Sequence, residues 1–116
     1  MLIALEGIDT AGKSTQLALL KEHYSDALFT KEPGGTPLGQ PVRSLLLTEH
    51  DYGIRTEFLL FVADRAEHYH KVISPNKDSL IFSDRGVVSG IAYAHPSLDE
   101  AFVIASNRFA LEGDFP

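Results

Sequence analysis

The sequence predicts an α/β protein in which a parallel sheet is flanked by helices. Three short apolar runs, at 2–5, 27–30 and 80–82, alternate with segments of helical periodicity, as expected for parallel βαβ units. The first run leads into the segment 7–14, which fits the G-x-x-x-x-G-K-[ST] phosphate-binding pattern at every fixed position. Ligands of such folds bind at the carboxyl ends of the strands, so we expect the site there.

The phosphate-binding pattern predicts a nucleotide-binding loop between the first strand and the first helix. Its glycines let successive backbone N–H groups point into one concavity, and the following helix adds its positive N-terminal end. Lys13 is then placed to reach the β- and γ-phosphates, and the Ser14 hydroxyl to ligate Mg²⁺. The predicted phosphate-binding residues are Gly7, Ile8, Asp9, Thr10, Ala11, Gly12, Lys13, Ser14 and Thr15. An ordinary glycine turn before a helix is the alternative, which this context disfavours.

Helical periodicity and turn signals place the remaining elements. We expect helices over 13–24, 41–48, 55–73 and 87–93, and a last helix that begins at a cap on Ser97 or Asp99 and runs towards residue 112. The first helix continues as an amphipathic segment from residue 16. In the second helix and the long third helix, the predicted apolar faces consist of Val42, Leu45 and Leu46, and of Phe58, Leu59, Val62, Ala66, Tyr69 and Ile73.

The composition is that of one ordinary globular domain over residues 1–116, with 44% hydrophobic and 22% charged residues. No apolar run approaches the length of a membrane span and no signal peptide is visible, so we expect no membrane contact. The formal net charge of −6 argues against nucleic acid as a partner and requires that any phosphate-binding charge be concentrated locally. Because the sequence has no cysteine, a cytoplasmic location is the default expectation.

Two further places in the sequence indicate phosphate or base chemistry. Asp84 follows the third apolar run, where P-loop enzymes place a carboxylate that helps to hold Mg²⁺; capping the next helix is the alternative. Arg85 suits a phosphate clamp, because a guanidinium binds two oxygens at once, and its alternative is a surface position. In the long helix, Arg65 pairs with His68 or is solvated. Phe61 is most simply a core residue, as most helical aromatics are, but it lies off the centre of the apolar stripe and could instead face a cleft and stack on a base. The five histidines show no metal-ligand spacing and are interpreted as surface residues.

Four blocks of the sequence together resemble the thymidylate kinase family. They span 5–9, 29–36, 60–68 and 83–85, the last followed by Ser89 and the pair 92–93. The blocks occur in the order and with the spacing of the family, and E-P-G-G-T at 32–36 is distinctive among nucleotide kinases. The resemblance implies the P-loop nucleoside monophosphate kinase fold and the phosphorylation of dTMP to dTDP, with ATP as donor and Mg²⁺ as cofactor, in the synthesis of dTTP. It also implies a homodimer.

The resemblance assigns roles to the residues that match. The catalytic residues that it implies are Lys13, Asp9 and Arg85. Phe61 would stack on thymine, and Arg65 would hydrogen-bond the carbonyl edge of the base. The implied dTMP-binding set is Asp9, Glu32, Pro33, Arg43, Phe61, Arg65, Arg85, Ser89 and Tyr93. Within it, the implied clamp on the acceptor phosphate consists of Arg43 and Arg85. The implied Mg²⁺ ligands are Ser14 and Asp84, with Asp9 as a further candidate.

Three residues depart from the family pattern. Gly86 stands where an aromatic residue is usual, and Ala94 where a glutamine is common. Thr10 stands where some members carry a catalytic arginine, and members without it supply one from a lid later in the chain. The sequence stops before that segment, at about the expected fourth strand. We therefore expect an N-terminal portion of a bacterial-type enzyme without the C-terminal strands and lid, with its first strand at an open edge and with weak or no turnover alone.

Two alternative functions stay open. One is another P-loop kinase acting on a nucleoside or a different small molecule, which the E-P-G-G-T block and the pair of Phe61 and Arg65 disfavour. The other is a non-catalytic nucleotide-binding module, which the expected loss of the lid makes plausible.

Overall fold

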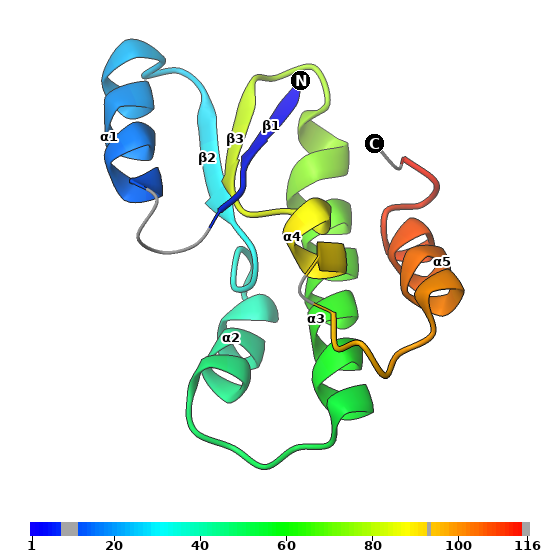
Figure 1. Ribbon diagram of the computed structural model, residues 1–116. Coiled ribbons are helices and arrows are strands. Elements are labelled where there is room, and N and C mark those ends of the chain that lie inside the picture. The colour runs from blue at the N-terminus through cyan, green and yellow to red at the C-terminus, as the bar shows by residue number, and fades with distance from the viewer. Residues whose placement is uncertain (8–11, 93, 115–116) are drawn as a thin grey trace.

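The computed structural model describes residues 1–7, 12–92 and 94–114 (Figure 1). Its centre is a three-stranded parallel sheet of β1 (Leu2–Leu5), β2 (Leu28–Lys31) and β3 (Ile81–Asp84), in the order β1-β3-β2. The register pairs both Leu5 and Lys31 with Asp84, so all three strands end at the same level. This edge of the sheet is where the sequence predicts the ligand site.

The helices begin and end close to their predicted bounds. They are α1 (Lys13–His23), α2 (Gly39–Leu47), α3 (Ile54–His68), α4 (Val87–Ala92) and α5 (Glu100–Ala110). The expected long helix continues beyond α3 as the π-helical segment η1 (Tyr69–Ile73) and the 3₁₀ turn η2 (Ser74–Asn76). Of the two predicted caps for α5, Asp99 is the one used, because its carboxylate accepts from Phe102 N at 3.1 Å.

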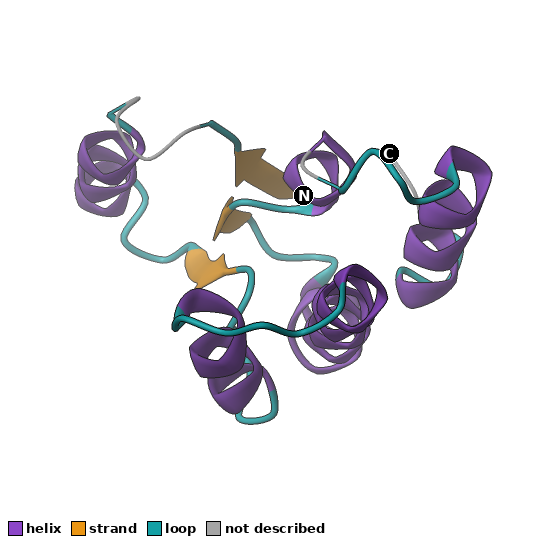
Figure 2. Ribbon diagram, turned by 60° about the horizontal axis from the view of Figure 1, so that its bottom comes forward, coloured by secondary structure: helices purple, strands orange, loops and turns teal. Residues whose placement is uncertain are grey.

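The sheet separates α1 from α3 and α5, which lie on its other side (Figure 1). Figure 2 shows the same separation, with one helix standing alone at one side of the strands. The core on the α3 side consists of Tyr69, Ile73, Ile81 and Leu111. These residues come from η1, β3 and the turn after α5, so the core fixes the C-terminal half of the described chain against the central strand.

The strand β1 pairs with β3 alone among the described residues, and Leu2 and Ile3 are 48% and 39% exposed. The open edge expected for this strand is therefore present. None of the helices in the described ranges combines the length and apolar character that a membrane span requires.

Parts of the predicted apolar faces are wrong. Leu59 is 54% exposed and Leu45 is 43% exposed, although Phe58 and Leu46 beside them are buried. Adjacent helical residues lie about 100° apart, so a narrow contact buries one of them and leaves the other in solvent. The amphipathic face predicted for α1 is also wrong, since Lys13 is the buried residue of that helix. A hollow of about 400 Å³ lies between α1, β2 and the loop that follows β2, so α1 is loosely packed on this side.

Candidate functional site

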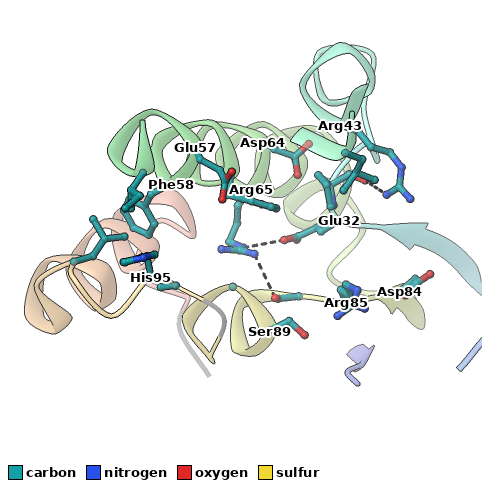
Figure 3. Close-up of a pocket in the computed structure, with 18 of the residues that line it drawn as sticks. Glu32, Arg43, Glu57, Phe58, Asp64, Arg65, Asp84, Arg85, Ser89 and His95 are labelled. Atoms are coloured by element: carbon teal, nitrogen blue, oxygen red, sulfur yellow. Dashed lines mark hydrogen bonds and ion pairs between the residues drawn. The ribbon is translucent and has the colours of Figure 1, made fainter. Parts of the chain in front are cut away.

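A pocket of about 370 Å³ opens at the carboxyl ends of the strands. Its walls come from α1, the loop after β2, α2, α3, the segment from the end of β3 into α4, and the loop between α4 and α5. It brings together most of the described residues of the predicted site, namely Lys13, Glu32, Pro33, Arg43, Phe61, Arg65, Asp84, Arg85 and Ser89. Figure 3 shows Arg65 in the middle, with Arg43, Arg85 and Asp84 towards one end and Phe58 and His95 towards the other.

The phosphate-binding loop is described at its two ends. Gly7 and Gly12 have positive φ values of 145° and 78°, a backbone region that favours glycine. Gly12 caps α1, whose first turn contains Ser14 and Thr15, both exposed. The predicted site residues Ile8, Asp9, Thr10, Ala11 and Tyr93 lie outside the described residues.

Lys13 and Asp84 form an ion pair at the mouth of this loop. The Lys13 Nζ lies 2.7 Å from Asp84 Oδ1, and the lysine is 8% exposed. Parallel strands with a common end level bring the start of α1 and the end of β3 together in this way. The pair places a cation and a carboxylate where the predicted phosphates and Mg²⁺ would meet.

The residues present fit a magnesium ion that arrives with a nucleotide. Ser14 and Asp84 offer a hydroxyl and a carboxylate, and Mg²⁺ prefers such hard oxygen ligands together with phosphate oxygens and waters. No group of three or more histidine and acidic side chains in the described ranges converges on a common point.

Arg65 is buried, and its guanidinium donates hydrogen bonds to acceptors from three different segments. Its Nε donates to Glu32 Oε1 at 2.8 Å, its Nη2 donates to Gly86 O at 3.3 Å, and its Nη1 donates to Asn107 Oδ1. The residue is 4% exposed and still lines the pocket (Figure 3). The alternatives of solvation and of pairing with His68 are therefore wrong.

His68 is fully buried, which contradicts its interpretation as a surface histidine. Its Nδ1 donates to Glu32 Oε2 at 2.7 Å, and its Nε2 lies 2.7 Å from the Thr30 hydroxyl. Both ring nitrogens thus have partners, which removes the cost of burying them. The i, i+3 spacing of Arg65 and His68, which puts both on one face of α3, was the available signal. His50 is half-buried as well, with its Nε2 3.4 Å from Glu57 Oε2.

The pKa values of the two buried carboxyl groups beside Arg65 shift in opposite directions. Burial by itself raises the pKa of Glu32, but the hydrogen bond from His68 and the charge of Arg65 outweigh it and leave the pKa below its ordinary value. Burial raises the pKa of Asp64, although the hydrogen bond from Gly34 N opposes the shift. Glu32 is therefore held as a carboxylate, and Asp64 is ionised at some cost.

We predict opposite pH dependences for variants of these residues. Ionised Glu32 stabilises the fold above its ordinary pKa of 4.5, and this stabilisation is lost as the pH falls through the lowered pKa of the folded state. Glu32→Gln should therefore lower the free energy of unfolding by about 3 kcal/mol at neutral pH, because it leaves Arg65 without its counterion. It should also weaken the loss of stability that the wild-type chain shows as the pH falls into the acid range. For Asp64, the cost of ionisation appears as the pH rises from 3.8 through the raised value, so Asp64→Asn should be neutral or stabilising at neutral pH. Urea unfolding as a function of pH measures both effects. If the Glu32→Gln variant lost stability at acid pH as steeply as the wild type, the stabilising role of ionised Glu32 would be refuted.

The loop after β2 is fastened to α2 and α3. Gly34 N donates to Asp64 Oδ1 at 2.9 Å, and the Arg43 Nη1 donates to Pro33 O at 2.8 Å. At Gly39, a Cβ would collide with the Asp64 carboxylate, so glycine permits this close approach. Glu32 and Pro33 are thereby held in the wall of the pocket.

The segment after β3 turns sharply into the pocket. Arg85 has a φ of 70°, which is uncommon for a residue other than glycine, and its N–H donates to Leu5 O at 3.0 Å. A Cβ on Gly86 would lie 3.2 Å from the Ala4 Cβ, so the glycine that departs from the family pattern is closely packed against β1. The Ser89 hydroxyl donates to the Glu6 carboxylate and is buried in the pocket wall.

The expected local excess of positive charge is not found among the described residues. The cations that line the pocket are Lys13, Arg43, Arg65 and Arg85, and the carboxylates that line it are Glu32, Glu57, Asp64 and Asp84. Two of the cations are paired with carboxylates, at 2.7 and 2.8 Å. The described lining of the pocket therefore carries equal numbers of positive and negative side chains, whereas the chain as a whole has a net charge of −6. Two of its ion pairs are already formed without a ligand.

Sequence reasoning missed Phe58 and Asp64, which line the pocket, and Asn107, which contacts Arg65. Phe58 was expected in the core, and it is buried with its ring centroid 6.0 Å from that of Phe102, but it also lines the pocket. Asp64 adjoins Arg65 in the sequence without a pattern of its own. Asn107 contacts Arg65 from a helix that begins 35 residues later in the chain, and no local pattern predicts such a contact.

Comparison with known proteins confirms the resemblance. The family model described as thymidylate kinase matches residues 5–115. The curated thymidylate kinase of Sulfurimonas denitrificans is 54% identical over 118 residues, covering 100% of this chain and 62% of the relative. That of Helicobacter hepaticus is 54% identical over 121 residues, covering 100% and 62%. The chain therefore spans about three fifths of the length of these relatives.

A solved structure supports the same relationship at the level of the fold. The crystal structure of thymidylate kinase from Ehrlichia chaffeensis matches with a TM-score of 0.85 and 36% identity, over 95% of this chain and 69% of that one. The prediction of an α/β P-loop kinase fold is thereby confirmed. By its sequence and by its fold, the chain belongs to the thymidylate kinase family.

Proposed function

We propose that the protein acts as a thymidylate kinase, transferring the γ-phosphoryl group of ATP to dTMP to give ADP and dTDP. The observation that carries the proposal is one pocket whose lining combines an aromatic ring and a guanidinium suited to a base with cations suited to phosphate. Arg65 and Phe61 supply the former, and the cations at the strand ends supply the latter. Family membership supports the same reaction.

On the acceptor side, the base would lie against Phe61 with a carbonyl oxygen at Arg65. The two residues are four positions apart on α3, so they share one face of the helix. A hydrogen bond from a charged group contributes roughly 1.5–3 kcal/mol, and an aromatic contact adds about 1 kcal/mol. Arg43 and Arg85 would clamp the acceptor phosphate, because both line the same pocket at the end opposite Phe58 (Figure 3).

On the donor side, the phosphate-binding loop would hold the triphosphate, with the described Gly7, Gly12 and Lys13 at its ends. The ion pair with Asp84 holds the Lys13 side chain in position there, so phosphate oxygens would compete with that carboxylate for the ammonium group. Ser14 and Asp84 would hold Mg²⁺, which when bound neutralises charge on the phosphates. The chain itself supplies mainly alignment and positive charge, which is what phosphoryl transfer needs.

The proposal includes a homodimer in the cytoplasm. The resemblance to the family implies the homodimer, and Leu59 on α3 and Phe109 on α5, which are 54% and 82% exposed, are candidates for the contact between copies. The absence of cysteine supports the cytoplasmic location. Sedimentation equilibrium of the chain tests the dimer, and a monomer at all concentrations would refute it.

Thermal stabilisation by mononucleotides tests the proposed function. A ligand at about 100 times its Kd stabilises a protein by about 2.7 kcal/mol, which raises the Tm of a domain of this size by several degrees. We expect dTMP to produce such a shift and UMP, dCMP, AMP and GMP to produce much smaller ones. Stabilisation by ATP alone would favour a nucleotide-binding module without an acceptor site, and no response to dTMP would contradict the proposal.

A further inference from the structure

We infer that Asn107 of α5 is a positioning residue for the base-reading Arg65, and that Gly90 of α4 provides the space in which the guanidinium is held. This inference rests on the proposed function, because it concerns how the same pocket recognises its base. Arg65 would touch the nucleotide, whereas Asn107 would act through Arg65.

The orientation of the Asn107 amide is fixed by its second hydrogen bond. The residue is fully buried, and its Nδ2 donates to Val103 O at 2.7 Å within α5. A backbone carbonyl only accepts, so the amide nitrogen must face Val103. The Oδ1 atom therefore faces Arg65 Nη1 as an acceptor, with no alternative assignment of the amide.

The three acceptors around Arg65 determine which of its donors remain for a ligand. A guanidinium carries five N–H groups in one plane. Glu32 takes the one on Nε, Asn107 takes one on Nη1, and Gly86 O takes one on Nη2. Two N–H groups then remain that no acceptor among the described residues takes. A base that presents a carbonyl oxygen satisfies them, whereas an exocyclic amino group does not.

Gly90 packs directly against the guanidinium. A Cβ at this position would lie 2.6 Å from both Nη1 and Nη2, which is closer than any side chain tolerates. The φ of Gly90 is not in the left-handed region, so its backbone does not require glycine. Glycine is also less favourable than alanine within a helix. The close approach of Arg65 is therefore the physical reason for glycine here.

These contacts fix the guanidinium from independent elements. Glu32 lies after β2, Gly86 lies after β3, and Asn107 lies on α5. An arginine side chain has substantial rotamer entropy, so its orientation at the base depends on such restraints. Without Asn107, the Nη1 end loses its restraint and a buried N–H group loses its partner. The expected consequence is a loss of preference for a carbonyl over an amino group on the base.

The test is the ratio of the dissociation constants for dCMP and dTMP, measured by isothermal titration calorimetry. Asn107→Ala is expected to lower this ratio at least about 10-fold, mainly by weakening dTMP binding. Asn107→Asp retains the acceptor for Arg65 and loses the donor to Val103 O, so it should keep most of the preference even if it is less stable. Gly90→Ala should lower the ratio as Asn107→Ala does, because its Cβ displaces the guanidinium.

The matched control is Val103→Ala on the same helix. Val103 is 3% exposed, so its truncation destabilises α5, but the hydrogen bonds of Arg65 do not involve its side chain and its carbonyl remains. We expect it to lower the Tm and to keep the ratio of the wild-type chain. If Asn107→Ala and Gly90→Ala also kept that ratio, the inference would be overturned while the proposed function stood. If the wild-type chain did not bind dTMP, the proposed function itself would fail.

Discussion

Replacing Arg65 with alanine is expected to weaken dTMP binding about 10- to 100-fold and to abolish the preference for thymine over cytosine. The variant loses the donors that would face the base carbonyl, and charged hydrogen bonds of this kind contribute roughly 1.5–3 kcal/mol. Titration of dTMP and dCMP into the variant measures both effects. The Glu32 carboxylate also loses its partner, so the fold should be less stable than that of the wild type.

A control for this experiment lies on the same helix. Arg55 is exposed at the start of α3, so Arg55→Ala removes the same charge from the chain without changing the pocket lining. We expect it to bind dTMP as the wild type does. Arg65→Lys should fall between the two, because lysine keeps the charge but lacks the planar fork. Unchanged base preference in a folded Arg65→Ala variant would rule out the assignment of Arg65 to the base.

Replacing Lys13 with alanine is expected to weaken the binding of ATP with Mg²⁺ by about 10-fold or more. The Lys13 ammonium lies at the end of the phosphate-binding loop, and the variant loses the charge-assisted contacts that it would make to phosphate oxygens. Calorimetric titration with ATP measures the effect, and titration with dTMP should show a smaller loss.

Lys21→Ala is the matched control for Lys13→Ala. Lys21 is an exposed lysine on the same helix, so its removal changes the net charge equally and leaves the loop intact. Wild-type affinity for ATP is expected for this variant. Equal affinities for ATP in the Lys13→Ala and Lys21→Ala variants would show that the loop does not bind the triphosphate as proposed.

The parts of the fold that depend on local chemistry could be predicted from the sequence. The glycines at 7 and 12 adopt positive φ values, as a phosphate-binding turn requires, and Asp99 caps α5 through its side chain. The apolar runs form strands because short β segments between helices pair in parallel, and the most buried of them, β3, lies at the centre of the sheet. These features need no knowledge of distant contacts.

The parts that depend on tertiary partners could not be predicted in the same way. Histidine is polar, and the burial of His68 becomes favourable only because Glu32 and Thr30 meet both of its ring nitrogens. Leu59 is apolar and exposed because the contact on α3 is narrower than its hydrophobic stripe. Asn107 reaches Arg65 across 42 residues of sequence. In each case, the deciding atoms lie on another element.

A crystal structure of the chain with dTMP bound tests the central proposal most directly. We expect the phosphate between Arg43 and Arg85, the base over Phe61, and a base carbonyl within hydrogen-bonding distance of the two remaining N–H groups of Arg65. The contacts of Arg65 with Glu32 and Asn107 should be unchanged by the ligand. A nucleotide bound outside this pocket, or one whose phosphate occupies the end beside Phe58, would contradict it.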